Sequence, residues 1–236
     1  MTSIAIIGPD GAGKSTVVAR VVERLPVPAR RIYMGVNLEA SRLMLPTTRL
    51  ALEVKRRRGG RPDMVGSGTA PAGRRGLLRE ARSGLRLANW MAEEWFRQAV
   101  AWYHERRGRV VLFDRHFLCD YYANDVIGRR PGRPWTSRLH GRVLQRWFPR
   151  PDVVIYLDAP AEMLFARKGE STIEALEQKR REFLELEAVF DRFRVVDATR
   201  STDAVVDEVL EIITNAVGRP AASPEPAPDG YREDAA

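Results

Sequence analysis

A glycine-rich loop near the amino terminus constrains this sequence more than any other feature. It reads Gly8-Pro-Asp-Gly-Ala-Gly-Lys-Ser15 and matches the pattern G-x-x-x-x-G-K-[S/T] at every fixed position. An apolar run, residues 3–7, precedes the loop, and residues 15–25, whose apolar side chains recur with helical spacing, follow it. Backbone N–H groups in such a loop surround a phosphate at the positive end of a helix. The loop therefore predicts that the chain binds a nucleoside triphosphate.

Individual residues of the loop have expected roles. Lys14 is placed to reach the β- and γ-phosphates of ATP, and the Ser15 hydroxyl to ligate Mg²⁺. The residues expected to bind the nucleotide are Gly8, Asp10, Gly11, Ala12, Gly13, Lys14, Ser15 and Thr16. ATP and Mg²⁺ are thus the predicted cofactors.

Apolar strands and amphipathic helices alternate along the chain. Strands are predicted at residues 3–7, 31–34, 109–113, 152–157 and 194–196. Helices are predicted over residues 15–25, 85–106, 161–166, 173–190 and 202–217, with a further helix ending near residue 148. Nearly continuous apolar strands are typical of a parallel sheet covered on both faces. We therefore expect an α/β fold of the P-loop type, a three-layer α/β/α arrangement with a five-stranded parallel sheet.

The chain of 236 residues is expected to form one P-loop kinase domain over residues 1–218. Between about residues 38 and 85 the helical pattern blurs, because glycines interrupt ten basic residues that lie between Lys55 and Arg86. We expect this arginine-rich insertion to be irregular, with at most two short helices. A short lid is expected at about residues 166–172, and the proline-rich residues 219–236 predict a disordered tail.

Charge, cysteine content and the length of apolar runs limit which partners and which cellular location we expect. The net charge is +8, and four of the 39 basic residues are lysine. Such a balance suits an anionic partner, but it also fits arginines spread over solvated faces. Cys119 is the single cysteine, and no apolar run is long enough to span a bilayer. With no leader pattern at the start, we expect a cytoplasmic protein without a membrane span.

A second acidic group should end a strand beside the loop, where it can hold Mg²⁺ or its waters. Asp114 and Asp158 both follow apolar strands. Asp114 is favoured because Arg115 comes next, and a carboxylate beside a guanidinium suits phosphoryl transfer. Asp158 can also be explained as a helix cap before Pro160.

Four segments together resemble the thymidylate kinase family of nucleoside monophosphate kinases. They are Gly8 to Thr16, Phe113-Asp-Arg-His116, Tyr156-Leu-Asp-Ala-Pro160 and Arg167-Lys-Gly-Glu170. The resemblance implies an ATP-dependent phosphotransferase in which Asp10 faces the acceptor's sugar hydroxyl. It also implies that Asp114 and Arg115 lie by the metal and the transferring phosphoryl group, and that Arg167 and Lys168 close over the donor phosphates. The family tends to dimerise, so a homodimer is compatible with the resemblance.

The sequence departs from that family where the acceptor would bind. Residues 33–37, after the second strand, lack the family's arginine. Residues 89–95, on the helix before the third strand, also lack an arginine, and residues 117–122, after that strand, lack the family's serine and glutamine. We therefore expect a small-molecule phosphate acceptor whose identity stays open: a nucleoside monophosphate, or another phosphorylated or hydroxylated compound. The alternative is a nucleic-acid-associated P-loop kinase or ATPase that uses the arginine-rich insertion. We do not expect a nucleic-acid partner, because that segment lacks interleaved aromatic residues.

Overall fold

In the computed structural model, which describes residues 2–35, 43–57, 74–127, 135–169 and 171–218, five parallel strands form one sheet. The strands are β1 (Ser3–Ile7), β2 (Ala29–Tyr33), β3 (Val110–Asp114), β4 (Val153–Asp158) and β5 (Phe193–Asp197), in the order β2-β3-β1-β4-β5. The expected five-stranded parallel sheet is confirmed. The order reverses direction at β1, so the carboxyl ends of β1 and β3 border a crevice in which ligands of such sheets bind.

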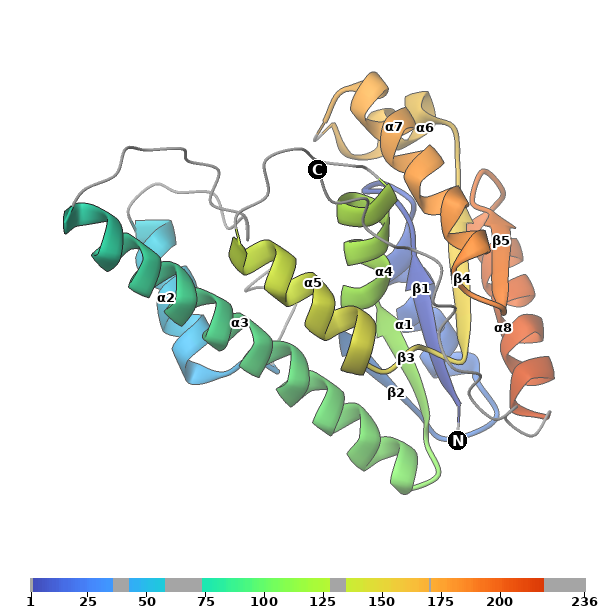
Figure 1. Ribbon diagram of the computed structural model, residues 1–236. Helices are drawn as coiled ribbons and strands as arrows, with labels where there is room; N and C mark the ends of the chain where they lie inside the picture. The colour runs from blue at the N-terminus through green and yellow to red at the C-terminus, as the bar shows by residue number, and fades with distance from the viewer. Residues whose placement is uncertain (1, 36–42, 58–73, 128–134, 170, 219–236) are drawn as a thin grey trace.

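Alternate residues of each strand enter opposite layers. Ile4 and Ile6 of β1 pack toward α1 (Lys14–Arg24), α6 (Ala161–Lys168) and α8 (Thr202–Val217). Ala5 and Ile7 pack toward α3 (Arg74–Arg106), α4 (Phe117–Tyr121) and α5 (Trp135–Trp147). Figure 1 shows α3, α4 and α5 together on one side of the sheet. The three-layer α/β/α prediction is confirmed, and both faces of the sheet are buried.

The helix before β3 is longer than the sequence suggested. It was expected from residue 85, but α3 begins at Arg74 and runs through Gly84. An added Cβ at Gly84 would meet nothing within 4 Å, so this glycine costs the helix only about 1 kcal/mol of intrinsic propensity. Gly84 therefore does not end the helix, and the glycines misled the prediction.

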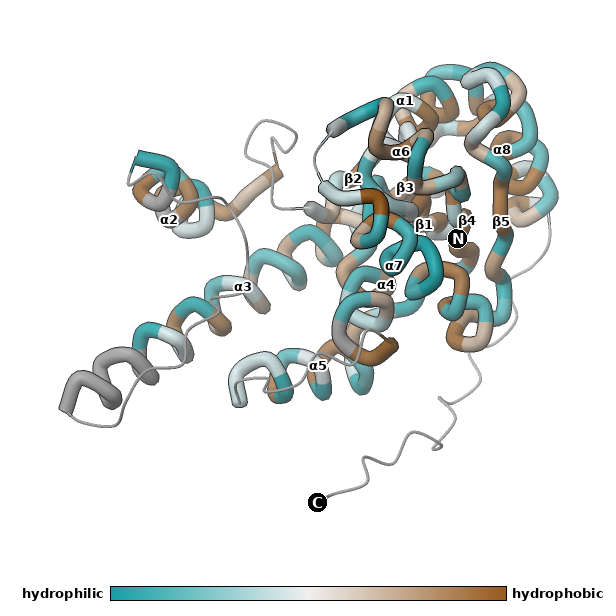
Figure 2. The backbone as a smooth tube through the Cα atoms, turned by 90° about the horizontal axis from the view of Figure 1, so that it is seen from above, coloured by the Kyte–Doolittle hydropathy of each residue, from teal (hydrophilic) through white to brown (hydrophobic). Residues whose placement is uncertain are grey.

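A second helix, α2 (Pro46–Arg57), packs against α3, and both project from the sheet in Figures 1 and 2. The expected irregular insertion therefore contains α2 and the first turns of α3, while residues 58–73 lie outside the described residues. The expected disordered tail also lies outside them. Among the described residues, no helix is long and apolar enough to cross a membrane.

Several local elements differ from the prediction. A π-helical segment, η1 (Tyr122–Ile127), follows α4 directly and has no counterpart in the predicted elements. The helix predicted over residues 173–190 is α7 (Ile173–Leu184) followed by a 3₁₀ turn, η2 (Glu185–Ala188). The lid was expected at the link between α6 and α7. Helix α6 ends at Gly169, which has φ 67°, and α7 begins after Thr172, whose side chain caps it.

Candidate phosphoryl-transfer site

The glycine-rich loop joins β1 to α1, as the sequence predicts. Gly8 and Gly11 have φ values of 149° and 93°, which L side chains rarely adopt. A Cβ at Gly8 would lie 2.8 Å from the carbonyl oxygen of Leu157, and one at Gly11 would lie 2.5 Å from that of Leu164. Both positions therefore require glycine, because the loop runs against β4 and α6.

Lys14 lies in the first turn of α1, and its side chain folds back over the loop. Its Nζ donates to the carbonyl oxygens of Gly8 and Pro9 at 2.8 and 2.7 Å. Burial, together with repulsion by Arg115, lowers the pKa of Lys14 to about 7. A polyphosphate bound in the loop would favour the charged form, so this ammonium is placed to bind anionic oxygens.

Ser15 and Asp114 come together from opposite sides of the β1–β3 crevice. Residue 114 pairs with Ile6 in the sheet register, and the Ser15 hydroxyl donates to Oδ2 of Asp114 at 2.8 Å. Oδ1 of Asp114 is buried without a hydrogen-bond partner among the described residues. Arg31 of β2, which sequence analysis did not single out, donates to Oδ2 at 2.5 Å. A hydroxyl beside a carboxylate with an unpartnered oxygen is a donor set that fits Mg²⁺.

Arg115 follows β3 with φ 70°, an uncommon conformation for a residue with a side chain. Its guanidinium donates to the Asp10 carboxylate, and Lys168 lies 3.6 Å from the same oxygen. Burial alone would raise the pKa of Asp10, but Arg115, Lys14 and Lys168, together with Lys179, hold it at about 2. The structure therefore places four of the predicted site residues, Asp10, Lys14, Arg115 and Lys168, in one electrostatic cluster.

A cleft of about 230 Å³ lies on the side of the loop that faces α6 and α8, which we call the donor side. It is lined by Gly11, Ala12, Gly13, Thr16, Val17, Arg167, Ala198, Arg200, Thr202 and Val205. Arg167 reaches from the end of α6 and donates to the carbonyl oxygen of Ala198 at 3.0 Å. Arg167 therefore lines this cleft, whereas Lys168, the next residue, lies 3.6 Å from Asp10.

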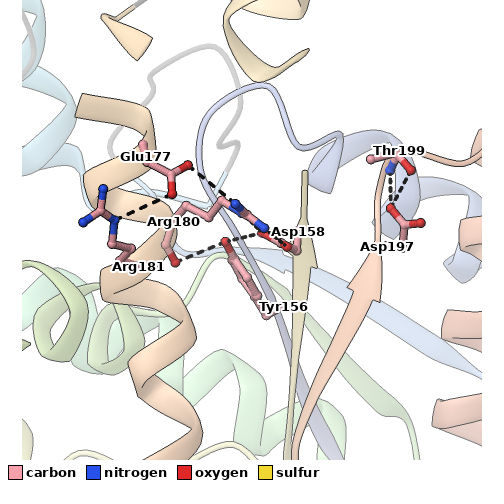
Figure 3. A network of polar contacts seen from close by, with 7 residues as sticks. All are labelled: Tyr156, Asp158, Glu177, Arg180, Arg181, Asp197 and Thr199. Atoms are coloured by element: carbon pink, nitrogen blue, oxygen red, sulfur yellow. Dashed lines mark hydrogen bonds and ion pairs between the residues drawn. The ribbon is translucent and has the colours of Figure 1, made fainter. Parts of the chain in front are cut away.

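Asp158, the other candidate for a metal ligand, has a different set of partners (Figure 3). Arg180 of α7 grips its carboxylate with two hydrogen bonds of 2.7 and 2.9 Å, and the Tyr156 hydroxyl donates to it at 3.1 Å. Glu177 lies 3.6 Å from both Arg180 and Arg181. Asp158 therefore ties α7 to β4, which a sequence could not reveal because Arg180 lies 22 residues away.

The sequence was compared with family models and with curated proteins. No family model matches the chain. It is 32% identical over 110 residues to "Probable thymidylate kinase 1" of Saccharolobus solfataricus, covering 44% of this chain and 54% of the relative. A thymidylate kinase of Thermomicrobium roseum is 33% identical over 130 residues, covering 50% and 60%. One from Thermosipho africanus is 29% identical over 118 residues, covering 47% and 57%.

The chain is thymidylate kinase-like. The resemblance stated from the four sequence segments is confirmed at that level. The chain spans little more than half the length of these curated relatives: 54% of the Saccharolobus protein, 57% of the Thermosipho protein and 60% of the Thermomicrobium protein.

The thymidylate kinase-like chain has an unexpected charge arrangement on the side of the loop that faces β2, α3 and α4, which we call the acceptor side. Arg97 of α3 is 1% exposed. It donates to Glu93 at 2.7 Å and to the carbonyl oxygens of Tyr33 and Gly35 at 2.8 and 2.7 Å. Sequence analysis found no arginine at residues 89–95 and missed Arg97, which lies one helical turn beyond Glu93 and neutralises its carboxylate.

Glu94 is likewise buried and paired. His140 of α5 contacts its carboxylate at 2.8 Å, and the Trp90 indole nitrogen donates to it at 2.6 Å. The i, i+4 spacing of Trp90 and Glu94 was visible in the sequence, but the contact with α5 was not. These pairs connect α3 to β2 and α5. The buried carboxylates of Glu93 and Glu94 on the acceptor side therefore have hydrogen-bond partners within the protein.

Proposed function

We propose that this protein transfers the γ-phosphoryl group of ATP to a small-molecule acceptor. The observation that carries the proposal is the convergence of Lys14, the Ser15–Asp114 pair and Arg115 at the carboxyl ends of β1 and β3. Phosphoryl transfer needs positioned reactants and stabilised charge rather than covalent chemistry by the protein. The thymidylate kinase relatives support a phosphotransferase of the nucleoside monophosphate kinase kind.

The donor would lie with its phosphates in the glycine-rich loop and its nucleoside in the donor-side cleft. Backbone N–H groups at the start of α1 would bind the phosphates, and Lys14 would exchange its two carbonyl partners for phosphate oxygens. Arg167 lines that cleft and is our candidate for a positive charge over the donor phosphates. Lys168 would supply a second cation from the same end of α6.

Ser15 and Asp114 would hold Mg²⁺, directly or through its waters. Held there, Mg²⁺ would supply positive charge against the charge that develops on the donor phosphates. Asp114 accepts a hydrogen bond from Arg31, which fixes the orientation of the carboxylate. Arg115 would stabilise the transferring group from the acceptor side, where Asp10 holds its guanidinium.

Measuring ADP formation with a panel of nucleosides, sugars, polyols and their monophosphates tests the proposal. We expect ADP only when an acceptor is present, and we expect Lys14→Ala to lose at least about 100-fold in turnover, because each charge-stabilising donor is worth 10²–10³-fold. Arg24→Ala is the matched control, since Arg24 lies on the same helix and contacts the exposed Asp207. A Lys14→Ala protein with an unchanged melting temperature and near wild-type turnover would refute the proposal.

A further inference from the structure

An ion pair joins the edge strand β2 to the end of β3, where the metal site is expected. A guanidinium nitrogen of Arg31, Nη2, lies 2.5 Å from Oδ2 of Asp114. The side chain of Asp114 is 1% exposed and that of Arg31 is 33% exposed, so the pair is buried at the carboxylate and open to solvent at the guanidinium. Because the carboxylate is buried, solvent does little to screen it from the charge of Arg31.

The register of the sheet determines this contact. Arg31 is the Cα partner of Leu112, and Tyr33 is the partner of Asp114, so Arg31 reaches its acid diagonally between neighbouring strands. Leu112 belongs to the core layer that contains α1, and alternate residues of a strand share one face of the sheet. Arg31 and Asp114 therefore both point toward the layer of α1, whose second residue is Ser15.

The two oxygens of the Asp114 carboxylate have different surroundings. Oδ2 accepts hydrogen bonds from Arg31 at 2.5 Å and from the Ser15 hydroxyl at 2.8 Å. Oδ1 is buried and has no hydrogen-bond partner in the described part of the chain. The Ser15 hydroxyl gives its single proton to Oδ2, so its oxygen keeps its lone pairs. Oδ1 of Asp114 and the Ser15 oxygen are therefore the two atoms left to bind a cation or its water.

Arg31 also offsets the negative charge of this carboxylate. Free Mg²⁺ gives up its hydration water reluctantly, and proteins usually bind it through one or two carboxylates together with the phosphates of a substrate. Asp114, whose charge is matched by a neighbouring guanidinium, attracts a free divalent ion less strongly than an unpaired carboxylate would. The phosphates of a nucleotide supply further negative charge, so an ion that they already hold still meets Oδ1 favourably.

We propose that Arg31 is a positioning residue that makes Asp114 accept Mg²⁺ as its nucleotide complex rather than as the free ion. By holding Oδ2, Arg31 turns Oδ1 of Asp114 toward the ion. Its positive charge keeps the site from binding Mg²⁺ before the nucleotide arrives. The inference rests on the proposed function and deepens it, because it names the species that enters the site and the residue that selects this species.

A purely structural role for the Arg31 side chain would have different consequences. Strands β2 and β3 are already paired through their backbones along the whole of β2. Beyond the end of β2, the Met34 N–H donates to the carbonyl oxygen of Asp114 at 3.0 Å. The two strands are thus joined without the side chain of Arg31. If Arg31 only fastened the strands, replacing it would lower the melting temperature and leave the affinity for Mg²⁺ unchanged.

Titrating the nucleotide-free protein with Mg²⁺ tests the inference without any catalysis. The rise of the melting temperature with MgCl₂ concentration, at constant ionic strength, would give the affinity for the free ion. The wild type would be compared with Arg31→Gln, which keeps a donor for Oδ2 but has no charge, and with Arg31→Lys, which keeps the charge. We expect Arg31→Gln to bind free Mg²⁺ at least about tenfold more tightly than the wild type, and Arg31→Lys to bind it as weakly as the wild type.

Two further variants locate the bound ion and control for the loss of an arginine. The double variant Arg31→Gln/Asp114→Asn should lose the added affinity, because the ion then has no carboxylate at this position. Arg30→Gln is the matched control and should bind free Mg²⁺ like the wild type, since Arg30 is exposed and, as the preceding residue of β2, points to the opposite face of the sheet. Free Mg²⁺ in excess over ATP should slow phosphoryl transfer by Arg31→Gln more than transfer by the wild type, because an ion bound first has to leave before the nucleotide complex enters.

Several results would overturn the inference and leave the proposed phosphotransferase intact. Folded Arg31→Gln protein that binds free Mg²⁺ no more tightly than the wild type would show that Arg31 does not weaken this binding. An equal gain in Arg31→Lys would remove charge as the cause, and a gain that persists in Arg31→Gln/Asp114→Asn would place the ion elsewhere. Equal inhibition of wild type and Arg31→Gln by excess Mg²⁺ would remove the selection of the nucleotide complex. Absence of phosphoryl transfer with every acceptor would instead contradict the proposed function, and the inference with it.

Discussion

Replacing Arg97 by methionine is expected to destabilise the fold more than any surface charge change. Arg97 and Glu93 are 1% and 2% exposed, so the substitution would leave a buried carboxylate without its cation. Removing one partner of a buried pair costs about 3–5 kcal/mol. The substitution also removes two hydrogen bonds to the carbonyl oxygens of Tyr33 and Gly35.

Thermal unfolding measures this cost. For a chain of this size, 1 kcal/mol shifts the melting temperature by about 2–4 °C, so we expect a fall of about 6–20 °C. Arg181→Met is the matched control, because Arg181 has a glutamate at the same i−4 spacing but is 70% exposed. Such exposed pairs contribute about 0.3–0.5 kcal/mol, so the control should shift the melting temperature by about 2 °C or less.

The double variant Glu93→Met/Arg97→Met separates charge from packing. Replacing a buried pair by apolar side chains is often neutral, so the double variant should recover most of the stability that Arg97→Met loses. The reasoning would be refuted if Arg97→Met cost less than about 1 kcal/mol, or if the double variant lost the sum of the two single losses.

Two further predictions concern the site. Asp114→Asn should lower turnover by about 100-fold or more and weaken the dependence on Mg²⁺, because losing a metal ligand costs several kcal/mol. Asp158→Asn should change turnover less than tenfold, since its partner is Arg180; steady-state kinetics with varied Mg²⁺ would expose the opposite ranking. Thymidine monophosphate should be a poor phosphate acceptor, with kcat/KM at least about 10²-fold below the ordinary range of 10⁴–10⁸ M⁻¹s⁻¹, and a value within that range would contradict this.

The predictable part of the structure comes from contiguous sequence. The loop from Gly8 to Ser15 contains its own turn residues, its lysine and its helix start. The pair Asp114–Arg115 directly follows an apolar strand, so a parallel sheet that places β3 beside β1 brings both segments to one edge. The loop and the strand end could therefore be related without knowing any side-chain contact.

The rest depends on contacts between distant segments. Arg31 reaches Asp114 across 83 residues of sequence, and Arg180 reaches Asp158 across 22.

Tracing the γ-phosphoryl group itself tests the central claim most directly. ATP labelled with ¹⁸O in the γ-phosphate would be incubated with the protein, Mg²⁺ and the acceptor panel, and mass spectrometry would locate the label. We predict that the labelled phosphoryl group appears on an organic acceptor, and that Lys14→Ala abolishes its transfer. Label found only in inorganic phosphate would indicate an ATPase, and label remaining in ATP with every acceptor would show that the protein transfers no phosphoryl group; either result would contradict the account.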